Sequence, residues 1–428
     1  MHKHVYEAID ETLYETTLPN GLKVMLIPKT ESEKTFGIFM TNYGSIDRTF
    51  TPLGKNEMTT VPDGIAHFLE HKLFEKEDRD VFTDFLSEGA SPNAYTSFTK
   101  TAYLFSATSN IERNVEILLD FVQSPYFSEE SVEKEKGIIE QEIKMYDDQV
   151  DFKLYMQTLQ NMYETHPVRI DIAGTVESIQ HITKNDLYTC YETFYHPSNM
   201  VLCIVGNFQV EHLMDTIQKN QATKTFATPT PIKRAEITEK ETVYKAEQVM
   251  SMDVSMPKVM IGMKHNPDFV NETERMKHEL MEQWVLDYFF SSSGDFYEIL
   301  YKDELIDESF DYQSTVEEAF NFTLFSSNTE NPTLFHKRLT SLLYQIKSYP
   351  FTEENLDKMK RKWMGEYIIE MDSLEYIANE YCHYYFEGID FFTMQQIAHN
   401  ITLADLRSFI ENWVQEDKLT VTMIEKES

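Results

Sequence analysis

The most informative stretch of the chain is His67-Phe68-Leu69-Glu70-His71. The residues before it, Pro62-Asp63-Gly64, predict a helix that begins here and ends near Phe74, with Asp63 as its cap. Residues three and four apart lie on one face of a helix, so His67, Glu70 and His71 point in the same direction. The stretch therefore places two imidazoles and one carboxylate on a single helical surface.

This arrangement suits a catalytic zinc ion. Two imidazoles four residues apart can both reach one Zn²⁺, and a carboxylate between them can hold a water bound to that metal. Zinc lowers the pKa of its bound water towards neutrality and leaves one position open for substrate. The pattern is the H-x-x-E-H motif of the inverzincins, the reverse of H-E-x-x-H. Two surface histidines can also lie four apart by accident, so a third ligand has to decide between the two interpretations.

The segment 131–146 offers four glutamates as candidates for that third ligand. Projected as a helix, its apolar face is formed by Ile138, Ile139, Ile143 and Tyr146. Glu142 falls in the middle of this face, and Glu135 falls on the same face one turn further back. Glu133 and Glu140 point away from it and are expected to be exposed to solvent. Because glutamate is rarely buried unless it is paired or binds a metal, we expect Glu142 to be the ligand. Glu135 is expected to support the site or to lie near substrate.

The chain is organised as two related parts. An Asn20-Gly21 turn beside an alternating run predicts a strand within 17–28, a second strand is expected at 36–42, and alternation predicts a third at 95–108. Helices are expected at 81–88, 110–123 and 128–163. Three stretches recur later in the chain in the same order and at nearly constant spacing: residues 104–106 at 324–326, 124–130 at 348–354, and 182–187 at 401–406. The segment 221–240 is rich in Thr, Pro and Lys and reads as a linker. We therefore predict two α+β halves, residues 1–220 and 241–428.

Composition excludes several classes of function. The chain has 38 Lys and Arg against 72 Asp and Glu, a formal charge of −34, and such a surface repels nucleic acid and anionic membranes. It could attract cationic peptides, but simple solubility is the favoured explanation of the charge. The three cysteines have no metal-ligand spacing, and neither a signal-peptide core nor a membrane-spanning run is present. These features predict a cytoplasmic protein.

Four stretches together resemble one family of enzymes. They are Gly64-Ile65-Ala66 followed by the His67–His71 motif, Ser91-Pro92-Asn93-Ala94-Tyr95-Thr96-Ser97, the pair Glu135 and Glu142, and His196-Pro197-Ser198-Asn199-Met200. Over nearly its whole length the chain is similar to the insulinase-like metallopeptidases, which include pitrilysin and the mitochondrial processing peptidase.

The resemblance implies a fold and a set of roles. The fold is a clamshell-type subunit of two homologous halves, each a mostly antiparallel sheet with helices packed on it. His67, His71 and Glu142 are implied to bind one Zn²⁺, with Glu70 as the catalytic base and Glu135 assisting it. A substrate peptide is implied to add as a β-strand beside the strand that carries Asn93, Ala94 and Tyr95.

The second half departs from the family pattern. Its counterpart of the zinc helix, near residues 280–290, has no histidine pair, so we expect one zinc per chain and no metal site in the second half. The family usually carries an Arg and a Tyr there that bind substrate; here the Arg position holds Tyr301 and the Tyr position falls at Asp307 or Glu308. The resemblance thus implies the zinc-bearing member of a bacterial two-subunit enzyme, whose homologous partner supplies the Arg and Tyr. A homodimer that uses Lys302 or Tyr312 instead is the alternative.

The predicted function is that of a zinc metalloendopeptidase acting on short unfolded peptides. The alternative is a non-catalytic structural or peptide-binding subunit of the same fold. Metal content distinguishes the two, because only the first requires about one zinc per chain.

Overall fold

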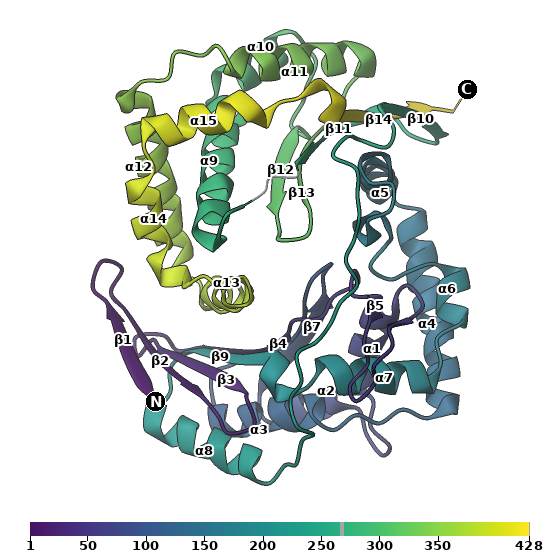
Figure 1. The fold of residues 1–428 in the computed structure, drawn as a ribbon, viewed down its shortest axis with the longest axis vertical. Coiled ribbons are helices and arrows are strands. Elements are labelled where there is room, and N and C mark those ends of the chain that lie inside the picture. The colour runs from purple at the N-terminus through teal and green to yellow at the C-terminus, as the bar shows by residue number, and fades with distance from the viewer. Residues whose placement is uncertain (266–268, 428) are drawn as a thin grey trace.

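The computed structural model describes residues 1–265 and 269–427, and these form two α+β halves (Figure 1). The first sheet has the strand order β1-β2-β3-β9-β4-β8-β7, with bounds β1 (His2–Tyr6), β2 (Glu11–Thr17), β3 (Lys23–Pro28), β9 (Met200–Gly206), β4 (Thr35–Thr41), β8 (Thr101–Ala107) and β7 (Ala90–Thr96). Only β3 and β9 pair in parallel. A small ribbon joins β5 (Thr49–Phe50) to β6 (Thr59–Thr60).

The second sheet is smaller and has the order β10-β14-β11-β13-β12. Its strands are β10 (Glu247–Met252), β14 (Leu419–Lys426), β11 (Lys258–His265), β13 (Asn321–Asn328) and β12 (Asp311–Val316). Here only β10 and β14 pair in parallel. The prediction of two α+β halves with mostly antiparallel sheets is confirmed.

Helices cover both sheets. The first half contains α1 (Ile65–Phe74), α2 (Val81–Ser87), α3 (Ile111–Val122), α4 (Glu129–Asp147), α5 (Val150–Met162), α6 (Val176–Gln180), α7 (Lys184–Phe194) and α8 (Val210–Ala222). The second half contains α9 (Glu272–Phe290), α10 (Asp295–Lys302), α11 (Pro332–Ile346), α12 (Glu353–Glu370), α13 (Leu374–Phe386), α14 (Met394–Asn400) and α15 (Leu403–Trp413). Short 3₁₀ turns lie at Pro167–Arg169, Pro197–Asn199, Phe391–Thr393 and Glu416–Lys418.

The recurring stretches of sequence fold alike. The first pair lies in β8 and β13, and the second pair leads into α4 and α12. The third pair begins α7 and α15, where Thr183 and Thr402 cap the two helices in the same way. Each threonine hydroxyl accepts the backbone N–H of the aspartate three residues on, and the carboxylate of that aspartate accepts the backbone N–H of the threonine. Such a reciprocal cap satisfies two N–H groups that a helix start leaves open.

One helix from each half packs on the sheet of the other half. Helix α5 belongs to the first half by sequence but packs on β11 and β14 of the second sheet, and its counterpart α13 packs on β9 and β4 of the first sheet. Figure 1 shows α13 lying on the first sheet and α5 beside β11 and β14. The hydroxyl of Thr158 and the amide of Asn161 both donate to the Thr422 hydroxyl, at 2.8 and 3.0 Å. The two halves are therefore interlocked and not merely tethered.

The segment between the halves is docked on the protein near its end. The carboxylate of Glu239 accepts the backbone N–H groups of Glu164, Thr165 and His166 as well as the Lys264 ammonium. These bonds outweigh the opposing effect of burial and lower the pKa of Glu239 to about 2. The division into residues 1–220, 221–240 and 241–428 itself stays a prediction.

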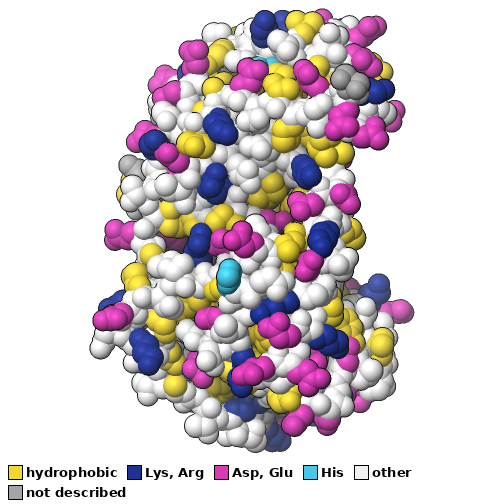
Figure 2. Space-filling model, turned by 90° about the vertical axis from the view of Figure 1, so that its right-hand side faces the viewer, with side chains coloured by type: hydrophobic (Ala, Val, Ile, Leu, Met, Phe, Trp, Pro, Cys, Tyr) yellow, Lys and Arg dark blue, Asp and Glu magenta, His cyan; other side chains and the backbone are white. Residues whose placement is uncertain are grey.

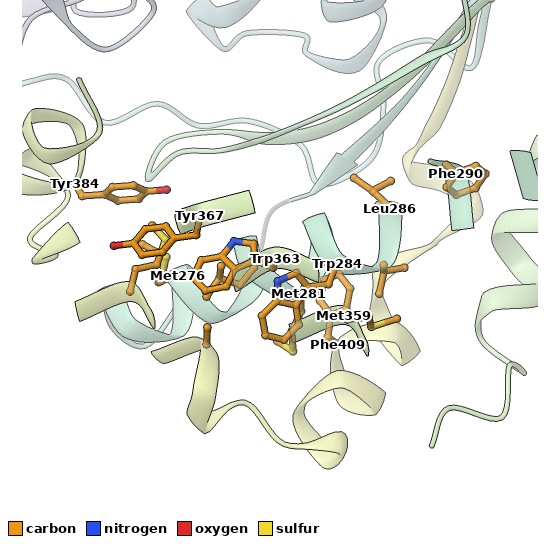
Figure 3. Packing of buried hydrophobic residues seen from close by; sticks show 14 of the residues in the cluster. Met276, Met281, Trp284, Leu286, Phe290, Met359, Trp363, Tyr367, Tyr384 and Phe409 are labelled. Carbon is orange, nitrogen blue, oxygen red and sulfur yellow. The ribbon is translucent and has the colours of Figure 1, made fainter. Parts of the chain in front are cut away.

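Apolar side chains fill the interior of both halves, and Figure 3 shows part of the second core around Trp284 and Trp363, whose ring centroids lie 6.2 Å apart. All three cysteines are buried and unpaired. On the face drawn in Figure 2, acidic and basic side chains are interspersed and do not form one large field of a single sign.

Three details of the sequence interpretation were wrong. The region 128–163 forms two helices, because the helical conformation is interrupted at Asp148-Gln149. This interruption allows α4 to pack on the first half while α5 packs on the second sheet. The region 95–108 is a hairpin whose turn spans residues 97–100. Asp63 does not cap α1: Gly64 holds the cap position at φ 90°, where a side chain would meet the Ala173 carbonyl, and the Asp63 carboxylate pairs with Arg48 at 3.1 Å.

Candidate metal centre

Two helices bring the predicted ligands together. Helix α1 buries Phe68 and Leu69 in the core and turns His67 and His71 to the opposite side, where α4 presents Glu142. Nε2 of His67 lies 3.6 Å from Oε1 of Glu142, and Nε2 of His71 lies 3.6 Å from Oε2 of the same carboxylate. The candidate ligand atoms of the three residues all lie within 4.8 Å of one another.

These separations fit a zinc ion. Ligand atoms about 2.1 Å from a tetrahedral zinc lie about 3.4 Å from one another. The observed 3.6 Å needs only a small contraction to reach that value. Two imidazoles and one carboxylate are also a donor set found in catalytic zinc sites, which keep their fourth position open.

The two histidines differ in what surrounds them. Burial, with the charge of His71, lowers the pKa of His67 to about 3 and so favours the neutral ring that can bind a metal. Burial acts on His71 in the same direction, but the hydrogen bond to Glu135 and the nearby carboxylates outweigh it and raise its pKa. Glu135 lies 3.2 Å from Nδ1 of His71, which fixes the ring with Nε2 towards Glu142. Nδ1 of His67 has no hydrogen-bond partner in the part of the chain that the structure describes, so packing alone orients this ring.

Glu70 lies beside the ligands on the same helix and is only 8% exposed. Burial raises its pKa, opposed by the charge of His71 and by the hydroxyl of Thr96, which donates to Oε2 at 3.0 Å. A carboxylate with a raised pKa is a stronger base than an exposed one, as general-base catalysis requires.

Glu133 and Glu140 of α4 point away, as the helical projection predicts. Glu133 is 68% exposed and pairs with Lys136, and Glu140 pairs with Lys144. The projection was wrong about Ile138, which is 47% exposed because it lies on the open side of α4. Glu142 therefore sits at the border of the apolar face rather than in its middle.

The strand with Asn93, Ala94 and Tyr95 lies at the edge of the first sheet. Among the described strands β7 pairs only with β8, so its other edge is open to a further strand. Helix α1 packs against β7, which places this edge beside the candidate metal ligands. The Tyr95 hydroxyl donates to Asn379 of α13 at 2.7 Å, so the second half anchors the strand.

The described residues contain one other cluster with metal-ligand types, formed by Glu317, His383 and Glu387. The ammonium of Lys100 lies inside it, 2.7 Å from His383 and 3.4 and 3.6 Å from the two glutamates. A cation of the protein itself thus occupies the position that a metal would take. The sequence gives no signal for this cluster, because its members come together only when the halves meet.

The residues considered as substitutes for the missing Arg and Tyr have partners within the second half. Tyr301 is 57% exposed and stacks on Tyr297, and Lys302 pairs with Glu298. Tyr312 donates to Asp287 at 2.7 Å.

The described residues form two interlocked α+β halves with one His-His-Glu cluster, the arrangement of the insulinase-like peptidase folds, and comparisons with known proteins agree. The family described as "Insulinase (Peptidase family M16)" matches residues 55–176, and "Peptidase M16 inactive domain" matches residues 181–362. The protein named "Uncharacterized zinc protease YmfH" of Bacillus subtilis (strain 168) is 48% identical over 98% of both chains. The chain therefore belongs to the insulinase family, peptidase family M16.

Two further relatives place it within that family. A crystal structure described as an M16-like peptidase from Alicyclobacillus acidocaldarius has a TM-score of 0.93 at 37% identity, covering 97% of this chain and 99% of the other. A probable beta subunit of the mitochondrial processing peptidase from Arabidopsis thaliana is 27% identical over 51% of this chain and 40% of its own length. Within the described residues no helix is long and apolar enough to cross a membrane.

Proposed function

We propose that the chain is a zinc-dependent endopeptidase in which His67, His71 and Glu142 bind one Zn²⁺. The observation that carries the proposal is the position of Glu142, which comes from a different helix and lies 3.6 Å from both imidazoles. A chance pair of surface histidines would have no reason to face a third ligand at that distance. The names of relatives as zinc proteases support the same conclusion.

The roles of the remaining residues follow from chemistry. A zinc ion held by these three residues would supply Lewis acidity, which acidifies water and polarises a peptide carbonyl. Glu70 accepts the proton of the attacking water and passes it to the leaving amine. Glu135 holds His71 in the orientation that points Nε2 at Glu142 and keeps negative charge beside that imidazole.

The substrate is a short unfolded peptide that adds to the open edge of β7 at Asn93, Ala94 and Tyr95. Strand addition reads the backbone of a peptide more than its side chains, and it requires an extended segment. A folded protein cannot present such a segment to an edge that lies beside α1 and is bonded to α13 through Tyr95.

We further propose that the chain is the catalytic subunit of a cytoplasmic two-subunit enzyme. Tyr301 stands where the family has an arginine, and the acidic Asp307 and Glu308 stand near the tyrosine position, so this half lacks donors for the developing oxyanion. A homologous subunit that keeps the Arg and Tyr supplies them. A homodimer, and a non-catalytic subunit that only binds peptide, are the alternatives.

The substitution Glu70→Gln tests the proposed activity. The amide fills the same space but cannot accept the proton, so the variant is expected to bind zinc like the wild type and to lose peptide hydrolysis. Zinc content and turnover of a peptide library are measured for both proteins, each together with the homologous subunit. Wild-type turnover by the variant would show that Glu70 is not the base, and absence of zinc from the wild type would favour the non-catalytic alternative.

A further inference from the structure

The hydrogen bond between Thr96 and Glu70 joins the substrate strand to the catalytic base. Thr96 is the last residue of β7, and its hydroxyl donates to Oε2 of Glu70 at 3.0 Å. Within the described residues this is the one hydrogen bond that a side chain gives to the Glu70 carboxylate. The end of a glutamate side chain rotates in a broad potential, so a single directed donor decides which way the carboxylate faces.

The alternation of β7 aims Thr96 at this carboxylate. Side chains two apart on a strand share a face, so Ala94 and Thr96 point to the same side of the sheet. Ala94 packs with the core on the α1 side, whereas Tyr95 points the other way and bonds to Asn379 of α13. Thr96 is therefore directed at α1 by the pleat itself.

The turn that follows Thr96 is held firmly from the second half. Lys100 closes the turn through its carbonyl, which accepts the Ser97 N–H at 2.7 Å, and its buried ammonium donates to His383 at 2.7 Å. Phe98 at the tip meets Phe320 edge-to-face with ring centroids 5.7 Å apart. The strand that carries Thr96 is thus fixed at its end by contacts to both halves.

We propose that Thr96 is a positioning residue for Glu70, and that the strand receiving the peptide also orients the base. This inference rests on the proposed function. The hydroxyl proton occupies Oε2, so Oε1 is the oxygen left free to take the proton of the attacking water. A peptide that pairs with β7 binds the backbone of the strand whose side chain aligns the base, so binding and alignment share one element.

The test compares Thr96→Val, Thr96→Ser and the control Thr101→Val. Valine removes only the hydroxyl function, and a hydrogen bond to a charged group is worth enough that kcat is expected to fall about 10- to 100-fold, with KM and zinc content unchanged. Serine keeps the donor and is expected to restore kcat to within a few-fold of wild type. Thr101 is the cross-strand partner of Thr96, but its hydroxyl donates to the Tyr43 carbonyl at 2.9 Å and not to Glu70, so Thr101→Val is expected to lose stability but to keep kcat.

Each outcome decides the matter when all proteins are zinc-loaded and assayed with the homologous subunit. Wild-type kcat in Thr96→Val, or an equal fall of kcat in Thr96→Ser, overturns the positioning role. Loss of zinc from Thr96→Val also overturns it, because the residue would then act on the metal site or the fold. A wild-type protein that hydrolyses no peptide overturns the proposed function first, and this inference with it, and so is distinct from a failure of Thr96 alone.

Discussion

Replacing Glu142 by alanine is expected to weaken zinc binding far more than replacing its neighbour Glu140. Glu142 is the proposed third ligand and the only carboxylate of the three, and its two oxygens lie 3.6 Å from Nε2 of His67 and of His71. Zinc sites with four protein ligands bind with roughly 10–16 kcal/mol, so one ligand accounts on average for about 2.5–4 kcal/mol. That loss corresponds to an affinity lower by about 100- to 1000-fold, since each 1.4 kcal/mol is about tenfold.

The control variant Glu140→Ala removes the same atoms from the opposite side of the same helix, because residues two apart point in nearly opposite directions. Glu140 pairs only with Lys144 on the outer side of α4, and such exposed pairs contribute about 0.3–0.5 kcal/mol to stability and nothing to the metal. Zinc affinity is measured for both variants by competition with a chromophoric chelator, and thermal unfolding confirms that each is folded. Equal zinc affinity in Glu142→Ala and Glu140→Ala would refute the assignment of the third ligand.

Three further predictions concern the support of the metal, the pH dependence and the partner. Glu135→Gln is expected to weaken zinc binding by about 10- to 100-fold because it disturbs the partner of His71, whereas Glu133→Gln on the same helix changes nothing; equal affinities would contradict the role of Glu135. The side chain of His278 is only 17% exposed, and burial lowers its pKa to about 4. As the pH falls below about 6.5, the imidazole is therefore protonated in the unfolded chain before it is protonated in the folded one, and stability is lost between about pH 6.5 and about pH 4. Between pH 7.5 and pH 5 this residue accounts for about 2 kcal/mol, so urea unfolding of His278→Gln should show a pH dependence smaller by that amount, and an unchanged dependence would contradict the burial argument. Finally, the zinc-loaded chain alone is expected to turn peptides over weakly and to gain activity on addition of a homologous subunit with the Arg and Tyr; robust turnover by the chain alone would exclude the two-subunit proposal.

Features set by neighbours in the sequence were predictable. The spacing of His67, Glu70 and His71 determines their common face on any helix, and the reciprocal caps at Thr183 and Thr402 depend on residues three apart. The facial position of Glu142 followed from the period of α4, although Ile138 proved exposed, because a projection gives the direction of a side chain and not what covers it.

Features set by distant contacts were not predictable. The interlocking of α5 and α13 depends on residues such as Thr158 and Thr422 meeting across most of the chain, and nothing in their local sequence indicates it. The same holds for Lys100 in its cluster with His383. The interruption between α4 and α5 has only a weak local signal at Asp148-Gln149. Its consequence, the packing of α5 on β11 and β14 of the second sheet, depends on contacts that are distant in the sequence.

The central claim is that a single zinc ion is bound by His67, His71 and Glu142. Diffraction data collected on either side of the zinc absorption edge, from crystals of the protein grown with one equivalent of zinc, test it most directly. One anomalous peak per chain is expected, about 2.0–2.2 Å from an imidazole nitrogen of each histidine and from a carboxylate oxygen of Glu142. A peak elsewhere, such as at the Lys100 cluster, or no peak at all, would contradict the account.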